Sequence, residues 1–314
     1  MTQGIQSAVT GDILVAATQL NNSADDHAGE GRILHFDTQL QLKAEITLPH
    51  TTHLVGGLKF DPSGVLWAFD SQEFVILNLH HDGRIERRDE FGARPYSHAH
   101  FLSDGSVLLA EHVVGDHIKP EIAARMHTEL PFMPGTQHFG DGHVWHFAAD
   151  GRLIKEYATA THGGMGGFLG VTMSAVSADE KTLVYCSETG SRLMRYDLAN
   201  DTQLPDLQSF APPFPPGPPP MFFAMQYGTQ GELWVLRGGS VHRVDPVSGD
   251  TLGEAPLEGF GWALIELAAG PGTEAWVSNF FTGEGAKIDL QTGAKLASVQ
   301  TGAAKAVAGL AEVR

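Results

Sequence analysis

The chain has 314 residues and a net charge of −17, with 20 Lys plus Arg against 37 Asp plus Glu, and it contains one cysteine. This charge argues against binding to nucleic acid or to an anionic membrane, because both rest on Lys and Arg contacts to phosphate. A single cysteine excludes an internal disulfide and favours a cytoplasmic protein. No signal-peptide pattern is present, and no run approaches the ~18 apolar residues of a membrane span.

Six copies of one strand-and-turn pattern follow one another along the chain. In residues 57–85, apolar or alternating strands are separated by Gly-containing turns, and the same order recurs in later copies at steps of roughly 42–50 residues. The N-terminal copy lacks its first strand, and residues 305–314 supply a matching strand at the other end. We therefore predict one all-β domain over residues 1–314: a six-bladed β-propeller of four-stranded antiparallel blades, closed by the C-terminal strand.

Two segments interrupt this period. Residues 112–143 expand a loop of the third copy, and part of the segment could form a short helix with Pro at its start. Residues 210–220 are rich in proline, which favours an extended connector between two blades.

Histidines are the side chains that point most directly to chemistry. In a propeller the first strand of each blade lines the axis, and this register brings one set of residues to one mouth of the channel: His53, His98, His100, His112, His117 and Glu188. His98 and His100 are two residues apart, so their side chains point to the same side of a strand. We expect His53, His98 and His100 to bind a divalent metal ion, with zinc, iron or manganese favoured.

The alternative is that each histidine only forms hydrogen bonds to a neighbouring loop. His35, His146 and His242 occupy equivalent places in the third strands of their copies, and we interpret them as structural residues of the repeat. Cys186 is expected to be a buried strand residue rather than a nucleophile.

A group of side chains on the same face is expected to bind the substrate. Its members come from loops that enter first strands or join second and third strands: Phe222, Phe223, Trp262, Arg237 and Asn279. For the aromatic residues, packing between blades is the competing interpretation.

Residues 170–201 resemble a known group of propellers. The run GVTMSAVSADEKTLVYCSETGSRLMRYDLAND is similar to a segment of the calcium-dependent lactonases of the senescence-marker/gluconolactonase type and of strictosidine-synthase-like propellers. Residues 215–236 resemble a second segment of the same group. The resemblance implies a six-bladed propeller, a lactonase activity and an acidic site residue at Glu188.

The chain departs from this group at two expected metal ligands. Leu169 stands where the group has a metal-binding Asn, and Phe222 and Phe223 stand where it has Asp-Asn. Calcium takes six to eight oxygen ligands. Calcium is therefore less favoured here than a metal that imidazole binds.

The activity that the resemblance implies is metal-assisted hydrolysis of a small lactone or ester. The metal would polarise the carbonyl and lower the pKa of a bound water. Glu188, His112 or His117 would act as general base. A lyase that abstracts a proton beside a metal-bound carbonyl, and a ligand-binding propeller without catalysis, are the alternatives. The expected partner is a small-molecule substrate, with no nucleic acid and no membrane.

The insertion at residues 112–143 generates the first testable prediction. A long loop on the face that carries the histidines is expected to act as a lid over the mouth. Limited proteolysis should cut this segment first, and a bound ligand or metal should slow the cut. Equal cutting with and without ligand would show that the segment is not a lid.

Overall fold

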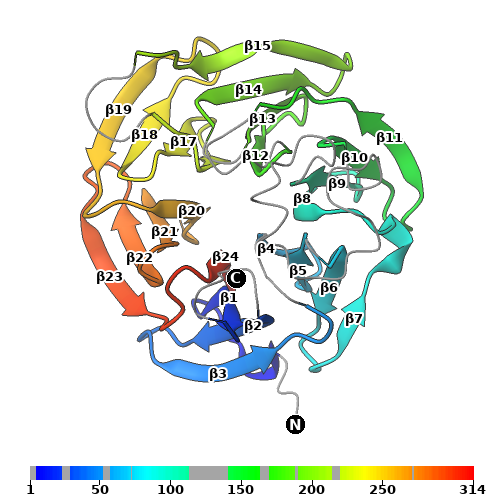
Figure 1. Cartoon of the computed structure of the whole chain (residues 1–314), viewed down its shortest axis with the longest axis vertical. Coiled ribbons are helices and arrows are strands. Elements are labelled where there is room, and N and C mark those ends of the chain that lie inside the picture. Colours follow the sequence, from blue (N-terminus) through cyan, green and yellow to red (C-terminus); the bar gives the residue numbers. More distant parts are fainter. Residues whose placement is uncertain are drawn as a thin grey trace.

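The computed structural model is a ring of six sheets around a central axis, with four antiparallel strands in each sheet (Figure 1). It describes residues 5–22, 29–51, 57–71, 73–112, 141–162, 170–187, 190–213, 220–270 and 272–314. This arrangement confirms the predicted six-bladed β-propeller. Most of the insertion (113–140) and residues 214–219 of the proline-rich connector lie outside the described residues.

The blades follow the order of the chain, and each is given from its innermost strand outward. Blade 1 contains β24 (Val307–Glu312), β1 (Ile13–Leu20), β2 (Gly29–Phe36) and β3 (Leu42–Thr47). Blade 2 contains β4 (Leu58–Phe60), β5 (Leu66–Asp70), β6 (Val75–Leu79) and β7 (Ile85–Arg87). Blade 3 contains β8 (Tyr96–Phe101), β9 (Val107–Glu111), β10 (Val144–Phe147) and β11 (Leu153–Tyr157).

The other three blades repeat this plan. Blade 4 contains β12 (Met173–Val176), β13 (Thr182–Cys186), β14 (Arg192–Asp197) and β15 (Thr202–Ser209). Blade 5 contains β16 (Ala224–Tyr227), β17 (Leu233–Leu236), β18 (Ser240–Val244) and β19 (Thr251–Pro256). Blade 6 contains β20 (Trp262–Leu267), β21 (Glu274–Asn279), β22 (Glu284–Asp289) and β23 (Lys295–Gln300). Two short 3-10 helices, η1 (Ile5–Ser7) and η2 (Asp89–Phe91), complete the described elements.

The ring closes through the pairing of the two ends of the chain. Strand β24 pairs antiparallel with β1, with Ile13 opposite Glu312 and Val15 opposite Leu310. Two further backbone bonds, from the Gly11 N–H to the Val313 carbonyl at 2.8 Å and from the Val313 N–H to the Asp12 carbonyl at 2.9 Å, extend the same ladder. The predicted closure by the C-terminal strand is therefore confirmed.

The hydrophobic core lies between the blades. Leu14 and Ile33 of blade 1, for example, pack in one cluster with Leu66 and Leu77 of blade 2. Middle strands such as β5 and β9 are buried along their whole length, because a neighbouring blade covers each face. Outer strands such as β3 and β23 alternate between partly buried or buried and exposed residues instead. Among the described residues, no helix combines the length and the apolar character that a membrane span would need.

The three histidines of third strands each bond within their own blade, as expected for structural residues. The His146 imidazole lies 2.7 Å from the Ser106 hydroxyl. His35 is more deeply embedded: its Nε2 lies 2.7 Å from the Asp12 carboxylate, both side chains are fully buried, and Lys43 Nζ contacts the same carboxylate oxygen. Loss of the His35 imidazole would leave a buried carboxylate with one partner fewer. His146 is therefore the better neutral control in mutagenesis.

Closure of the ring can be tested by truncation. Deletion of residues 305–314 removes the buried side chains of Val307 and Leu310 and leaves β1 as an unpaired edge. Each such aliphatic side chain contributes about 1.5–3 kcal/mol when buried. The truncated protein should be insoluble or melt at a much lower temperature in a thermal-shift assay. Arg314→Ala, which removes one exposed side chain, is the control, and an unchanged melting temperature in the truncation would refute the closure.

Candidate functional site

A cavity of about 220 Å³ lies in the central channel. The innermost strands of all six blades line it, namely β4, β8, β12, β16, β20 and β24. A second cavity of about 570 Å³ continues from it toward the face that carries the turns between first and second strands. The two cavities share Lys59, His100, Val176 and Glu266. The described part of the site thus lies inside the channel, deeper than the mouth at which the sequence analysis placed it.

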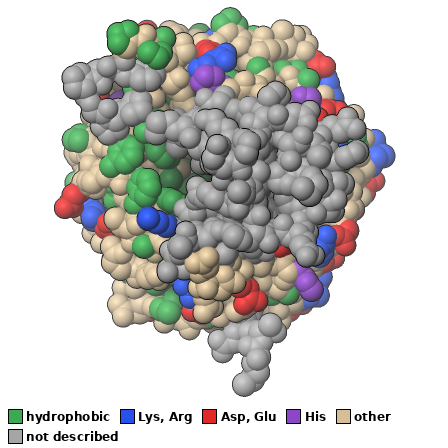
Figure 2. Space-filling view, in the orientation of Figure 1, with side chains coloured by type: hydrophobic (Ala, Val, Ile, Leu, Met, Phe, Trp, Pro, Cys, Tyr) green, Lys and Arg blue, Asp and Glu red, His purple; other side chains and the backbone are tan. Residues whose placement is uncertain are grey.

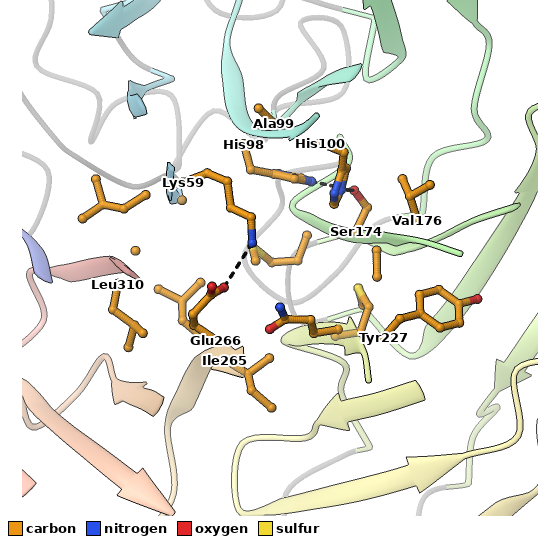
Figure 3. Close-up of a pocket in the computed structure, with 18 residues that line it drawn as sticks. Lys59, His98, Ala99, His100, Ser174, Val176, Tyr227, Ile265, Glu266 and Leu310 are labelled. Carbon is orange, nitrogen blue, oxygen red and sulfur yellow. Dashed lines mark hydrogen bonds and ion pairs between the residues drawn. The ribbon is translucent and has the colours of Figure 1, made fainter. Parts of the chain in front are cut away.

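His98 and His100 both face this cavity from β8 (Figure 3). The Nε2 atom of His98 lies 2.6 Å from the Ser174 hydroxyl oxygen, and Nε2 of His100 lies 2.8 Å from the same atom. The centroids of the two rings are 5.4 Å apart, and the ring planes are nearly perpendicular. Two imidazoles from one strand therefore converge on a single hydroxyl contributed by β12.

The channel keeps both imidazoles neutral. Burial lowers the pKa of His98 well below its usual range, and electrostatic repulsion between its protonated form and the basic groups of His100, His112 and Lys59 acts in the same direction. Burial, together with the ammonium of Lys59, lowers the pKa of His100 to about 3. A neutral imidazole is the form that accepts a proton or binds a metal ion.

An ion pair crosses the same cavity. Lys59 Nζ lies 3.2 Å from a carboxylate oxygen of Glu266, as the dashed line in Figure 3 shows. The other carboxylate oxygen of Glu266 lies 3.2 Å from an Arg314 guanidinium nitrogen. The Glu266 carboxylate is thus held by two cations, and the Lys59 ammonium is a positive group inside the cavity.

Ser174, Lys59 and Glu266 are not among the site residues predicted from the sequence. All three lie in strands that the repeat pattern places at the axis, in the segments VTMSAV, GLKF and LIEL. The signal was therefore present. Polar residues of any kind in an axial strand, and not histidines alone, mark a side chain that can face the channel.

The other residues expected at the metal and base positions are placed only in part. His112 follows β9, is buried, and lies close enough to His98 to lower its pKa. Its backbone is fixed by bonds to the Pro95 carbonyl at 2.8 Å and from the Gly170 N–H at 3.1 Å. The remaining three, His53, His117 and Glu188, lie outside the described residues.

The fit of a metal ion rests on the two converging imidazoles. Both are neutral and present Nε2 toward the same hydroxyl oxygen. Imidazole nitrogen is a ligand type that zinc, iron and manganese accept. Within the described ranges, the group of three potential ligand side chains is a different one, Asp141, His143 and Glu156, at the more exposed edge of blade 3. The third ligand that the sequence predicts, His53, lies outside those ranges.

Three of the residues expected to bind substrate are buried within blades 5 and 6. The rings of Phe222 and Trp262 are at most 1% exposed and belong to the core between blades. The amide of Asn279 holds the turn after β21, because its Oδ1 accepts the backbone N–H groups of Phe281 and Thr282. None of these three side chains is presented to solvent.

The other two are accessible and lie beside a group of aromatic rings. Phe223 contacts Phe260, and Phe260 stacks on Phe281, with the last two rings 38% and 49% exposed. The guanidinium of Arg237 lies 4.4 Å above the ring of Phe210. Hydrophobic side chains gather left of centre in Figure 2, over the part of the ring where β17 to β21 lie in Figure 1. A ligand at this face would meet an aromatic surface next to a cation.

Comparison with known proteins supports the fold but does not assign a family. No protein-family model matches this sequence, and no curated protein sequence matches it. Among solved structures, a protein of unknown function from Bacteroides caccae is similar with a TM-score of 0.64 at 12% identity, over 98% of this chain and 100% of the other.

Several of the similar structures carry enzyme names, among them a gluconolactonase and a lyase. A gluconolactonase from Xanthomonas campestris has a TM-score of 0.57 at 16% identity, over 88% of this chain and 85% of the other. Virginiamycin B lyase from Staphylococcus aureus has a TM-score of 0.50 at 13% identity, over the same shares of the two chains. At identities this low, the structural similarity shows the propeller fold alone.

Because the channel histidines are buried in their neutral form, we expect the protein to be less stable to unfolding at acidic pH. As the pH falls below about 6.5, the unfolded chain takes up protons that His98 and His100 do not bind in the folded state. The free energy of unfolding should fall by up to about 1.4 kcal/mol per pH unit for each such histidine. Urea unfolding at pH 7.5, 6.0 and 5.0 measures this dependence.

Two variants make the test specific. His100→Asn should unfold with a weaker pH dependence than the wild type, because one buried neutral imidazole is removed. His81→Asn, at an exposed turn, is the matched control and should follow the wild-type curve. An identical pH dependence in the wild type and His100→Asn would contradict the assignment.

Proposed function

We propose that this propeller is a hydrolase that cleaves a small lactone or ester in its central channel, with His98 and His100 as reactive side chains. The observation that carries the proposal is the convergence of two neutral imidazoles inside a cavity. The similarity to a gluconolactonase is consistent with it at the level of the fold. Fold alone does not assign a reaction, because one scaffold supports several activities.

The size of the cavity restricts the substrate. Pockets for drug-sized ligands span about 300–1,000 Å³, and the channel cavity beside the histidines measures about 220 Å³. The second cavity, of about 570 Å³, would give a substrate access from the face that carries the turns between first and second strands. A small molecule suits these dimensions better than a polymer.

A divalent metal ion is part of the proposal. His98 and His100 would hold it through Nε2, with His53 as the third ligand that the sequence predicts. When bound, such an ion polarises a carbonyl group and lowers the pKa of water. Zinc, iron or manganese suits imidazole ligands. Calcium is less favoured, because the cavity carboxylate, Glu266, is already held by Lys59 and Arg314.

The protein's own side chains support ester cleavage in two ways. A neutral imidazole can accept the proton that an attacking hydroxyl or water loses. The Lys59 ammonium can stabilise the negative charge that develops on the carbonyl oxygen, because it lies in the same cavity and is not exposed to bulk water on all sides. Glu266 fixes the position of that ammonium.

A lyase is the second candidate, and the same pair of groups favours it. A neutral imidazole could take a proton from the carbon beside a carbonyl, while Lys59 stabilises the resulting enolate. The products differ. Hydrolysis incorporates an oxygen atom from water, whereas elimination forms a carbon–carbon double bond that absorbs ultraviolet light.

Activity measurements on histidine variants test the proposal. A panel of small lactones and aryl esters should include substrates that the wild type cleaves, with oxygen-18 from water appearing in the acid product. His98→Ala and His100→Ala should each lower kcat/KM by about 10²–10⁴-fold, the usual contribution of an acid–base group. Elemental analysis of the same preparations shows whether metal is lost together with activity.

His146→Ala provides the matched control, because it removes a histidine that bonds within blade 3 and does not line the channel cavity. Its kcat/KM should equal that of the wild type. Full activity in the His98→Ala/His100→Ala double variant would overturn the proposed site. A double bond in the product would move the assignment to the lyase, and lack of turnover with every compound would favour a ligand-binding propeller.

A further inference from the structure

The contacts of the Ser97 hydroxyl favour a proton on Nδ1 of His98. Its oxygen lies 3.4, 3.2 and 3.3 Å from the carbonyl oxygens of Ala110, Val171 and Thr172, and 2.7 Å from His98 Nδ1. Carbonyl oxygens only accept hydrogen bonds, and a hydroxyl has one proton to donate. This environment favours a Ser97 hydroxyl that donates to a carbonyl oxygen, because three carbonyl oxygens facing its lone pairs would repel them. Its oxygen then accepts the N–H of His98 Nδ1.

This tautomer fixes the next bond in the chain. A neutral imidazole protonated at Nδ1 has a bare Nε2, which can only accept. His98 Nε2 lies 2.6 Å from Ser174 Oγ, so the Ser174 hydroxyl donates its proton to His98. The 2.8 Å contact to His100 must run the other way, with His100 Nε2–H donating to Ser174 Oγ. The Ser174 hydroxyl is thus oriented by one acceptor and one donor.

The local backbone explains how Ser97 and His98 come to cooperate. The ladder between β8 and β9 shifts register between Tyr96 and His98, so Ser97 is an extra residue at a bulge. Bulges redirect side chains relative to the regular alternation of a strand. Ser97 can therefore contact the imidazole of its neighbour while His98 still faces the channel.

We propose that Ser174 is a catalytic nucleophile, with His98 as its general base and Ser97 as the residue that positions His98. The arrangement of nucleophile, base and orienting group is the one that activates a hydroxyl for covalent catalysis. The substrate class, a small lactone or ester, rests on the proposed function. The nucleophile itself can be tested without any substrate.

The reaction balances with groups that the channel contains. Ser174 Oγ attacks the carbonyl carbon and its proton passes to His98 Nε2, so that a tetrahedral oxyanion forms near the Lys59 ammonium. The carbon–oxygen bond to the leaving alkoxide then breaks, and the alkoxide takes the proton from His98. A water molecule attacks the acyl ester on Ser174, gives one proton to His98, and releases the acid, after which the Ser174 oxygen recovers the proton.

Other serine–histidine pairs in the molecule show why this one stands apart. Ser106 contacts His146, but its hydroxyl donates to the Asp104 carboxylate at 2.5 Å, so it accepts from the imidazole and is not activated. Ser240 contacts His242 across two positions of the same third strand. Of the described serines bonded to an imidazole, Ser174 is the one that lines the channel cavity.

Labelling with diisopropyl fluorophosphate, a small reagent for activated serines, tests the nucleophile directly. Intact-mass and peptide mass spectrometry should find one phosphoryl adduct, located on Ser174. Ser174→Ala should abolish the adduct, and His98→Ala should slow labelling by about 10²-fold or more. Ser106→Ala is the matched control, and it should label at the wild-type rate.

Ser97 requires a readout that separates positioning from folding. Ser97→Ala should slow the labelling of Ser174 by about tenfold, and Ser97→Thr, which keeps a hydroxyl, should restore most of the rate. If Ser174→Ala does not fold, as judged by circular dichroism, Ser174→Cys provides a second test. Its thiol should be alkylated by iodoacetamide faster than the buried Cys186, and His98→Ala in that background should slow the alkylation.

The outcomes separate this inference from the proposed function. A wild type that hydrolyses lactones but gains no adduct on Ser174, with full turnover in Ser174→Ala, would overturn the nucleophile and leave the hydrolase proposal intact. An adduct on Ser174 in a protein that cleaves none of the lactones or esters would support the nucleophile and refute the proposed substrate class.

Discussion

The pairing of β24 with β1 is the interaction on which the rest of the structure depends. A four-stranded blade has two apolar faces and buries neither of them alone. Only when the two ends of the chain meet do blades 1 and 6 each have a neighbour on both sides, and the cluster of Ile13 and Leu34 with Trp276 then fills the last interface. The free energy of the core is thus shared among all six interfaces, and no blade is stable by itself.

Closure also creates the channel and its chemistry. Six innermost strands face one another across a narrow space, so a polar side chain that points inward loses water and must find a protein partner. His98 and His100 form hydrogen bonds with Ser174, and Lys59 forms an ion pair with Glu266. The same loss of water lowers the pKa of both histidines. A requirement for paired polar groups therefore yields neutral imidazoles beside a hydroxyl and a cation.

The metal-bound and serine-based forms of the proposed hydrolase compete for one atom. The Nε2 atom of His98 either binds a metal ion or accepts the proton of Ser174, and it cannot do both at once. A proton on Nδ1 of His98 leaves its Nε2 bare, which suits either arrangement. His100 separates them, because it donates from Nε2 in the serine form and would have to carry its proton on Nδ1 to bind a metal. The form that the protein takes therefore depends on whether a metal ion or the Ser174 hydroxyl contacts Nε2 of His98.

The sequence by itself determined the number of blades, the closure by the C-terminal strand and the side of β8 on which His98 and His100 lie, because a repeat and a two-residue alternation are local patterns. Tertiary structure decided which side chains meet. Ser174 is far from His98 in sequence, and β12 brings it to the channel only through the packing of neighbouring blades. Burial of Phe222 and Trp262 was likewise set by contacts between blades, which turn a residue at the start of a strand into core or surface without any change in the local sequence pattern.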